Sequence, residues 1–275
     1  MRDGREIATL DGRTVRFYDT GVVGATGLTV FWHHGTPQTG RILEPVAMLA
    51  AARGIRVISV ARPGYEGSTA LVGRNVADAA ADVLRIADEL GIDSFLSAGA
   101  SGGGPHALGC AALGSDRVSA VTVFAGIAPY STDFDWFAGM ADPSALRSAM
   151  GGEDARTRHG ETAEFNEASF IARDWTALSG EWKSLGADAG AAEQAGSAGE
   201  VADDVAYTIP WGFELESITV PVLFVQGDSD RVVPDSHATW LHEHVPDSEL
   251  WLRPGDGHVS VLAAYPDALD WALNR

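Results

Sequence analysis

The chain has 275 residues, of which 45% are hydrophobic, so it can form one large domain, or a core with one inserted subdomain. Its 38 acidic and 19 basic residues give a formal net charge of -19. This charge disfavours nucleic acids and anionic membrane surfaces as partners and leaves a small-molecule partner as the expectation.

The N-terminal residues are charged and no apolar stretch follows them, so no signal peptide is predicted. No apolar run approaches the length of a membrane span, and we expect a cytoplasmic protein. The single cysteine, Cys110, excludes an internal disulfide and is interpreted as a small buried side chain. The sequence gives no indication of the oligomeric state.

Strand-like and helical patterns alternate in the first half of the chain. Residues 6–10 and 14–19 flank an Asp-Gly turn and predict a hairpin. Apolar, strand-like stretches follow at 28–32, 55–60, 95–98 and 118–124, and helical spacing separates them at 41–53, 76–90 and 104–113. This order predicts an α/β fold with a mainly parallel central sheet and helices on both faces.

The alternation stops after residue 124. No strand of that kind is visible in residues 127–219, which contain helical stretches and scattered aromatic residues. Residues 186–199 are rich in alanine and glycine, which predicts a mobile loop or a poor helix. We therefore expect a mostly helical lid at residues 127–217, inserted into a core formed by residues 1–126 and 218–275.

Strands and helices alternate again at the end of the chain. Strands are expected at 220–225 and 249–252, and helices at 236–245 and 259–273. The first of these helices carries three histidines on a polar stretch, which we expect to be solvated: His237, His242 and His244.

The most informative segment reads G-A-S-G-G at residues 99–103, between an expected strand and an expected helix. A serine between small residues at such a corner is typical of a nucleophile elbow, because the glycines let strand and helix pass closely. The alternative interpretation is a plain glycine-rich turn. We predict that Ser101 is a nucleophile.

A serine hydroxyl needs a neighbouring base, and the base needs an orienting acid. His258 lies in a loop after the last expected strand, at the carboxyl edge of the sheet where such sites gather, and is the expected base. By contrast, His159 lies in a charged part of the lid, and His106 is expected to pack or cap locally. The loop after residues 220–225 offers two acids, Asp228 and Asp230. We favour Asp230, because Asp228 adjoins a tight turn that its side chain can stabilise.

Attack on a carbonyl creates an oxyanion, which needs N–H donors already in place. Gly102 offers one at the start of a helix, where the helix dipole helps. Thr36 offers the other expected backbone N–H, in the loop after an early strand. The neighbouring His33 and His34 lack further ligands at suitable spacing, so we expect structural hydrogen bonds from them and no metal.

Four features, in this order, resemble the α/β-hydrolase family, in its lidded, esterase-like form. They are H-G-T-P at 34–37, G-A-S-G-G at 99–103, G-D-S-D at 227–230 followed by V-P at 233–234, and G-H at 257–258. A further segment, R-P-G-Y-E-G-S at 62–68, resembles the family's R-G-x-G-x-S loop. The resemblance covers the expected core, and it implies that Asp230, the fourth residue of its G-x-x-D element, is the triad acid. The order Ser, Asp, His agrees with this fold.

The resemblance implies a serine hydrolase that cleaves a carboxylic ester without a cofactor or metal. A serine at the elbow disfavours epoxide hydrolases and haloalkane dehalogenases, which use aspartate there. The H-G-T-P loop departs from the H-G-G-P-G loop of proline iminopeptidases and weakens that interpretation. Peptidase, C–C bond, amide or lactone hydrolysis and perhydrolase or haloperoxidase activity stay open, as does a non-catalytic small-molecule receptor.

The aromatic residues of the expected lid suggest a pocket for an apolar or aromatic group of the substrate. Trp136 and Tyr130 follow the 118–124 strand, where the chain should cross above the site, and are candidate pocket residues. Val259, beside the expected base, is another.

Overall fold

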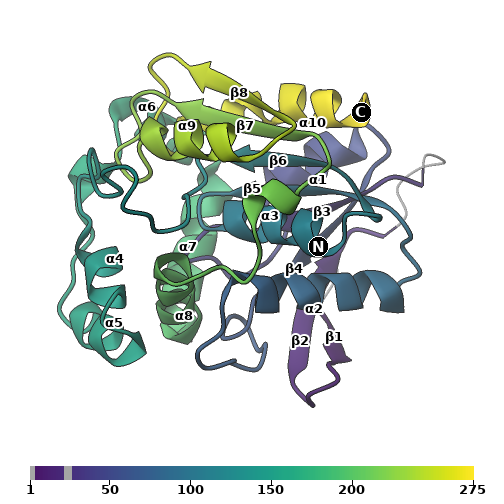
Figure 1. Ribbon diagram of the computed structural model, residues 1–275, viewed down its shortest axis with the longest axis horizontal. Helices are drawn as coiled ribbons and strands as arrows, with labels where there is room; N and C mark the ends of the chain where they lie inside the picture. Colours follow the sequence, from purple (N-terminus) through teal and green to yellow (C-terminus); the bar gives the residue numbers. More distant parts are fainter. Residues whose placement is uncertain (1–3, 22–26) are drawn as a thin grey trace.

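The computed structural model describes residues 4–21 and 27–275 (Figure 1). It contains an eight-stranded sheet in the order β1-β2-β4-β3-β5-β6-β7-β8. The strands are β1 (Arg5–Ala8), β2 (Thr14–Asp19), β3 (Thr29–His33), β4 (Arg56–Val60), β5 (Phe95–Ala100), β6 (Val118–Phe124), β7 (Val222–Gly227) and β8 (Ser248–Arg253). The β1–β2 and β2–β4 pairs are antiparallel and the other neighbouring pairs are parallel, which confirms the expected mainly parallel sheet.

Helices cover both faces of the sheet (Figure 1). One face packs against α2 (Val76–Glu89), α3 (Gly103–Leu113) and α9 (Asp235–His244), and the other against α1 (Glu44–Ala51) and α10 (Tyr265–Leu273). Side chains alternate along β3, so Phe31 joins the first core, whereas Val30 and Trp32 join the second. The sheet is therefore buried on both faces, as parallel sheets require.

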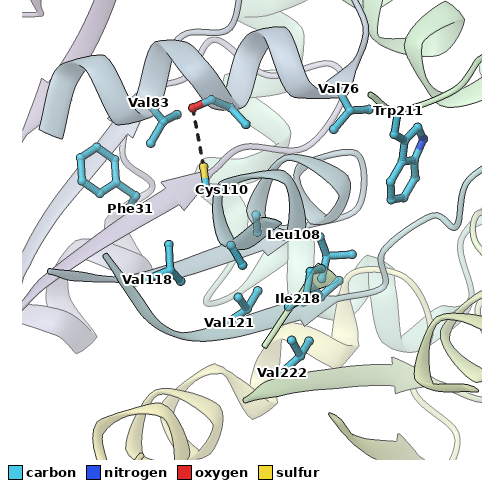
Figure 2. Close-up of a cluster of buried hydrophobic side chains, with 14 of the residues drawn as sticks. Phe31, Val76, Val83, Leu108, Cys110, Val118, Val121, Trp211, Ile218 and Val222 are labelled. Atoms are coloured by element: carbon cyan, nitrogen blue, oxygen red, sulfur yellow. Dashed lines mark hydrogen bonds between the residues drawn. The ribbon is translucent and has the colours of Figure 1, made fainter. Parts of the chain in front are cut away.

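Cys110 lies in the first of these cores. Figure 2 shows it between α2 and the sheet, among the apolar side chains of Phe31, Val83 and Leu108. The side chain is fully buried, and burial raises the pKa of its thiol. The predicted role as a small buried side chain is confirmed.

The chain between β6 and β7 forms helices beyond the carboxyl ends of the parallel strands, at the left of Figure 1. They are α4 (Ser144–Ala149), α5 (Glu153–Gly160), α6 (Ala172–Ser179), α7 (Lys183–Ala195) and α8 (Ala198–Thr208), with short 3-10 turns η1 (Glu167–Ser169) and η2 (Leu215–Ser217). We call residues 127–217 the helical insertion.

Of the two alternatives expected at residues 186–199, a mobile loop or a poor helix, the structure contradicts the loop and shows a helix. Most of this stretch belongs to α7, because alanine favours helix and the helix buries Asp188 and Ala192 on one side. Gly196, with a φ of 121°, separates α7 from α8.

The expected helix at residues 259–273 is divided in two. A 3-10 turn, η3 (Ser260–Ala264), precedes α10, which has a proline in its first turn. Proline lacks an N–H and is favoured at a helix start, so Pro266 fits the beginning of a new helix. Within residues 4–21 and 27–275, no helix has the length and apolar character needed to cross a membrane.

Candidate active site

Ser101 occupies a sharp corner between β5 and α3. Its φ of 53° lies in the left-handed region, which is strained for a residue with a side chain. A Cβ at Gly99 would overlap the backbone of Gly103, so strand and helix approach too closely for any other residue at that position. The glycines around Ser101 therefore permit the strand-to-helix corner that the sequence predicted, with Ser101 itself partly exposed.

Three side chains meet at the carboxyl edge of the sheet. Ser101 Oγ lies 2.9 Å from His258 Nε2, and His258 Nδ1 lies 2.8 Å from Asp230 Oδ2. They follow β5, β8 and β7 respectively, three parallel strands that end at the same edge of the sheet, with β6 between β5 and β7. The structure brings together all three residues of the predicted triad.

The Asp230 carboxylate is held firmly in place. Its Oδ1 accepts hydrogen bonds from the backbone N–H groups of Val232 (2.8 Å) and Val233 (3.0 Å), and Gln226 Nε2 donates to Oδ2 at 3.2 Å. These bonds leave Oδ2 directed at the imidazole of His258. Asp230 is thus buried and oriented, as an orienting acid has to be.

Asp228, the alternative acid, has a different environment. Its side chain is exposed and accepts hydrogen bonds from Gly255 N (2.7 Å) and Ser229 Oγ (3.0 Å). This is the turn-stabilising arrangement expected from the sequence.

The environment of His258 favours its protonated form. Burial alone lowers the pKa of the imidazole, but the charge and hydrogen bond of Asp230, with a contribution from Asp174, outweigh burial and raise the pKa above its ordinary value. The Phe170 ring lies parallel to the imidazole, with the ring centroids 6.5 Å apart. An imidazolium at this position would be stabilised, which is what a base needs after it has taken a proton.

The two predicted oxyanion donors lie beside Ser101. Gly102 immediately precedes α3, and Thr36 lies in the loop that follows β3. A Cβ on Gly35 would lie 3.6 Å from Ser101 Cβ, which places this loop against Ser101. A Cβ on Gly102 would overlap Thr36 Oγ1, so the two donor segments are in contact with each other.

A buried ionic network holds the Thr36 side chain. Thr36 Oγ1 donates to Asp203 Oδ2 at 2.7 Å and accepts from Arg62 Nη2 at 3.1 Å. Asp203 also pairs with Arg62 at 2.6 Å and with Arg74, and Tyr65 Oη donates to it at 2.9 Å. Arg62 and Tyr65 belong to the R-P-G-Y-E-G-S segment singled out in the sequence.

Sequence reasoning missed Asp203 and a second residue of α8, Tyr207. Tyr207 Oη lies 2.9 Å from Thr36 Oγ1 and donates to Gly102 O at 2.9 Å. Both residues lie in V-A-D-D-V-A-Y at 201–207, where charged residues interrupt an apolar helical pattern. Acids that interrupt an apolar helical pattern indicate that the helix buries them, and a buried acid is usually paired with a base or a hydrogen-bond donor.

The histidines next to the Thr36 loop serve structural roles, as predicted. His33 Nε2 lies 3.0 Å from Ser97 Oγ, and His34 Nδ1 lies 2.8 Å from Gly35 O. Burial holds the pKa of both imidazoles well below the ordinary value. The described parts of the chain contain no cluster of three or more His, Cys, Asp or Glu side chains arranged for a metal ion.

His106 is buried, as a packing role requires, but its Nε2 lies 3.5 Å from Asp203 Oδ1 on α8, so it packs against the insertion and not only locally as expected.

The prediction of a solvated His237 is wrong. This side chain is fully buried, its Nε2 lies 2.9 Å from Trp136 O, and Ala128 N donates to its Nδ1 at 3.2 Å. Helix α9 packs against residues 128–136 on this side, and burial lowers the pKa of His237 to about 4. His242 and His244 are half-buried rather than fully solvated.

A cavity of about 780 Å³ opens onto Ser101. Its lining includes Ser101, Gly102, Thr36, His258 and Val259, so the structure places Val259 where the sequence predicted it. Apolar side chains of the lining come from both the sheet edge and the insertion, among them Trp32, Ile127, Phe170, Leu185 and Leu262. Charged side chains also line it, among them Arg156, Glu193, Glu200 and Asp204.

Trp136 and Tyr130 lie away from this lining, which corrects the expectation that they form the pocket. Trp136 is 2% exposed, its Nε1 donates to Ala128 O at 3.0 Å, and its ring packs against His237. Tyr130 packs against Trp136 and is partly exposed to solvent. The chain after β6 therefore turns toward α9 instead of crossing above Ser101.

Solved structures with the same fold include several hydrolases. A bromoperoxidase from Bacillus anthracis has 24% sequence identity and a TM-score of 0.75, with 99% of this chain and 100% of that chain covered. An esterase from Exiguobacterium antarcticum has 23% identity and a TM-score of 0.72 over 99% and 100% of the two chains. An enol-lactonase from Burkholderia xenovorans LB400 has 17% identity and a TM-score of 0.73 over 98% and 100%. At these identities the similarity establishes the fold.

A short stretch of sequence is similar to a curated protein. Fifty residues are 36% identical to a pimeloyl-[acyl-carrier protein] methyl ester esterase from Nitrosomonas europaea, which is 18% of this chain and 20% of that esterase. The family described as alpha/beta hydrolase fold matches residues 29–264, which include β3 to β8 and the triad. With this match, the parallel sheet and the strand-to-helix corner at Ser101, the chain belongs to the alpha/beta hydrolase fold family.

Proposed function

We propose that this hydrolase-family protein is a serine esterase that cleaves a carboxylic ester through an acyl-enzyme intermediate. The observation that carries the proposal is the continuous chain of hydrogen-bonding distances from Ser101 Oγ through His258 to Asp230, at one wall of the cavity. The esterase and lactonase among the structural neighbours, and the short match to a methyl ester esterase, are consistent with it.

In the proposed reaction, His258 Nε2 takes the Ser101 proton as Oγ attacks the ester carbonyl. The backbone N–H groups of Gly102 and Thr36 receive the negative oxygen of the tetrahedral intermediate. The intermediate collapses when the imidazolium returns its proton to the leaving alcohol. Water then repeats the sequence on the acyl-enzyme, and the carboxylic acid leaves. Asp230 orients the imidazole throughout, and no metal or organic cofactor takes part.

The cavity supports a small, mainly apolar substrate. Its apolar side chains favour an aliphatic or aromatic group beside the reacting carbonyl. Its charged lining contains more acids than bases, which disfavours substrates that carry a carboxylate or phosphate.

A fluorophosphonate probe, which reacts with activated serines, tests the nucleophile. We expect labelling of the wild-type protein and none of Ser101→Ala. Ser119→Ala is the matched control, because Ser119 is an exposed serine on β6 away from the cavity lining, and it should label like the wild type. Undiminished labelling of Ser101→Ala would refute the assignment.

Turnover of p-nitrophenyl esters of increasing acyl length, beside an aminoacyl anilide and an aliphatic lactone, tests the bond type. We expect the esters to have the highest kcat/KM. Faster turnover of the anilide would favour a peptidase, and faster turnover of the lactone would favour a lactonase. A wild-type protein that binds these compounds, yet neither labels nor turns them over, would be a receptor on the same fold.

A further inference from the structure

We propose that Tyr207, on α8 of the helical insertion, is a positioning residue for the oxyanion hole. Its phenol bridges the two segments that carry the donors, the Thr36 loop and the start of α3. This inference rests on the proposed function, since it takes the N–H groups of Thr36 and Gly102 as the oxyanion donors.

The hydrogen-bond directions can be worked out from the available protons. The hydroxyl of Thr36 has one proton and donates it to Asp203 Oδ2, because a carboxylate can only accept. Thr36 Oγ1 also accepts from Arg62 Nη2. Tyr207 Oη also has one proton and donates it to Gly102 O at 2.9 Å, because a carbonyl can only accept. Its 2.9 Å contact with Thr36 Oγ1 joins two hydroxyls, and either proton can be shared across it while each keeps its fixed acceptor.

The environment keeps that proton on the phenol. Tyr207 is buried, and burial together with the negative charge of Asp203 raises the pKa of its hydroxyl. The bridge is thus a donor at any pH at which an ester hydrolase would be assayed.

The fit around the phenol is close. A Cβ on Gly102 would overlap both Tyr207 Oη and Thr36 Oγ1, so only glycine allows the three groups to meet. The first glycine after Ser101 therefore has a role beyond the strand-to-helix corner, because it leaves the space that the bridge occupies.

The bridge has a chemical consequence because oxyanion donors act over a narrow range of distance. Tyr207 holds the carbonyl of Gly102 on one side and contacts the Thr36 side chain on the other. Tyr207 also lines the cavity, so the insertion contributes directly to the geometry of the hole. Loss of the phenol should weaken binding of the tetrahedral intermediate far more than binding of the substrate.

Tyr207→Phe tests the inference, with Tyr18→Phe as the matched control. Tyr18 is also a buried tyrosine, but it lies on β2 and does not line the cavity. For a p-nitrophenyl ester, we expect Tyr207→Phe to lower kcat about tenfold with KM changed less than about twofold. The inhibition constant of a trifluoromethyl ketone, which forms a tetrahedral adduct with an active serine, should rise about tenfold. Tyr18→Phe should stay close to the wild type in all three.

Equal losses in both variants, or a change in KM alone, would show a structural or ground-state role and overturn the inference. Wild-type labelling and turnover with an unimpaired Tyr207→Phe would overturn the inference and leave the proposed function standing. A wild type that neither labels nor turns over ester would overturn both.

A second pair of variants keeps the test informative if Tyr207→Phe does not fold, as judged by thermal unfolding. Thr36→Ser keeps the hydroxyl that contacts Tyr207, and Thr36→Val removes it, while both keep the backbone N–H. The ketone should bind Thr36→Ser like the wild type and Thr36→Val about tenfold more weakly. Equal binding to the two would contradict the bridge.

Discussion

The sheet edge and the helical insertion contribute to the same cavity but hold their residues by different forces. Ser101, Asp230 and His258 each follow a strand of the sheet, and β5 and β7 are buried along their whole length. The strands before Ser101 and Asp230 are therefore held mainly by apolar packing, whereas β8, before His258, is only half-buried.

The insertion reaches the site loops through buried carboxylates. Asp174 Oδ1 accepts from the N–H groups of Val259 (2.9 Å) and Ser260 (2.8 Å), directly after His258. Asp188 accepts from Thr39 N at 3.0 Å, in the loop that carries Thr36. Asp203 binds Thr36 itself. Such contacts are directional, and breaking one leaves a buried charge or donor unpaired, so they fix orientation more strictly than apolar contacts do.

The largest effect is expected within the sheet edge, where two neighbouring acids can be compared. Asp230→Asn should lower kcat by about 10⁴-fold, because an amide favours the wrong imidazole tautomer and no longer stabilises the imidazolium. Asp228→Asn should lower it less than about threefold, since its exposed side chain only supports a turn. Ester turnover by the two purified variants measures the difference, and a greater loss in Asp228→Asn would reverse the assignment.

The next effect concerns stability and belongs to the insertion. Asp203→Asn leaves Arg62 and Arg74 buried without their counter-ion and should lower the free energy of unfolding by about 3–5 kcal/mol. Asp270→Asn is the control, because Asp270 also pairs with an arginine, Arg53, but at the surface, and it should cost about 1 kcal/mol or less. Urea unfolding at neutral pH measures both.

The difference in the free energy of unfolding between the wild type and Asp203→Asn should depend on pH in a definite direction. Burial alone would raise the pKa of Asp203, but the two guanidinium groups hold it well below its ordinary value. A carboxyl with a depressed pKa stabilises the fold at neutral pH and loses this contribution only as the pH falls through the depressed value. The gap between wild type and Asp203→Asn should therefore persist into mildly acidic solution. A gap that closes near pH 5 would show that the ion pairs contribute little.

The same contrast explains what could be predicted from the sequence. The sheet, the Ser101 corner and the loops of Asp230 and His258 were predictable, because alternating apolar residues and turn glycines reflect the forces that form them. The split between Asp228 and Asp230 also followed from local turn chemistry.

The insertion was less predictable, because its buried positions are not marked by apolar residues alone. Asp174, Asp188 and Asp203 look like surface residues in the sequence, and only their partners, far away in the chain, show that they are buried. The prediction that Trp136 lines the pocket failed for the opposite reason. A large aromatic residue packs in a core as readily as in a pocket wall, and Trp136 is buried in the core.

The smallest expected effect is on the titration of His258, which both regions influence. In the proposed reaction, His258 must be neutral to accept the serine proton, so kcat/KM should fall as the pH drops through the pKa of His258. That pKa is raised above its ordinary value of about 6.5 by Asp230 on the core side and, to a smaller extent, by Asp174 on the insertion side.

Removing a negative charge beside an imidazole lowers its pKa, so Asp174→Asn should move the acidic limb of the pH profile to lower pH. Asp228→Asn, which is not among the charges that raise the His258 pKa, should leave the limb in place. An acidic limb at the same pH in Asp174→Asn and the wild type would show that only the core, through Asp230, raises the pKa of His258. The insertion would then influence His258 only through the hydrogen bonds that fix the geometry of its loop.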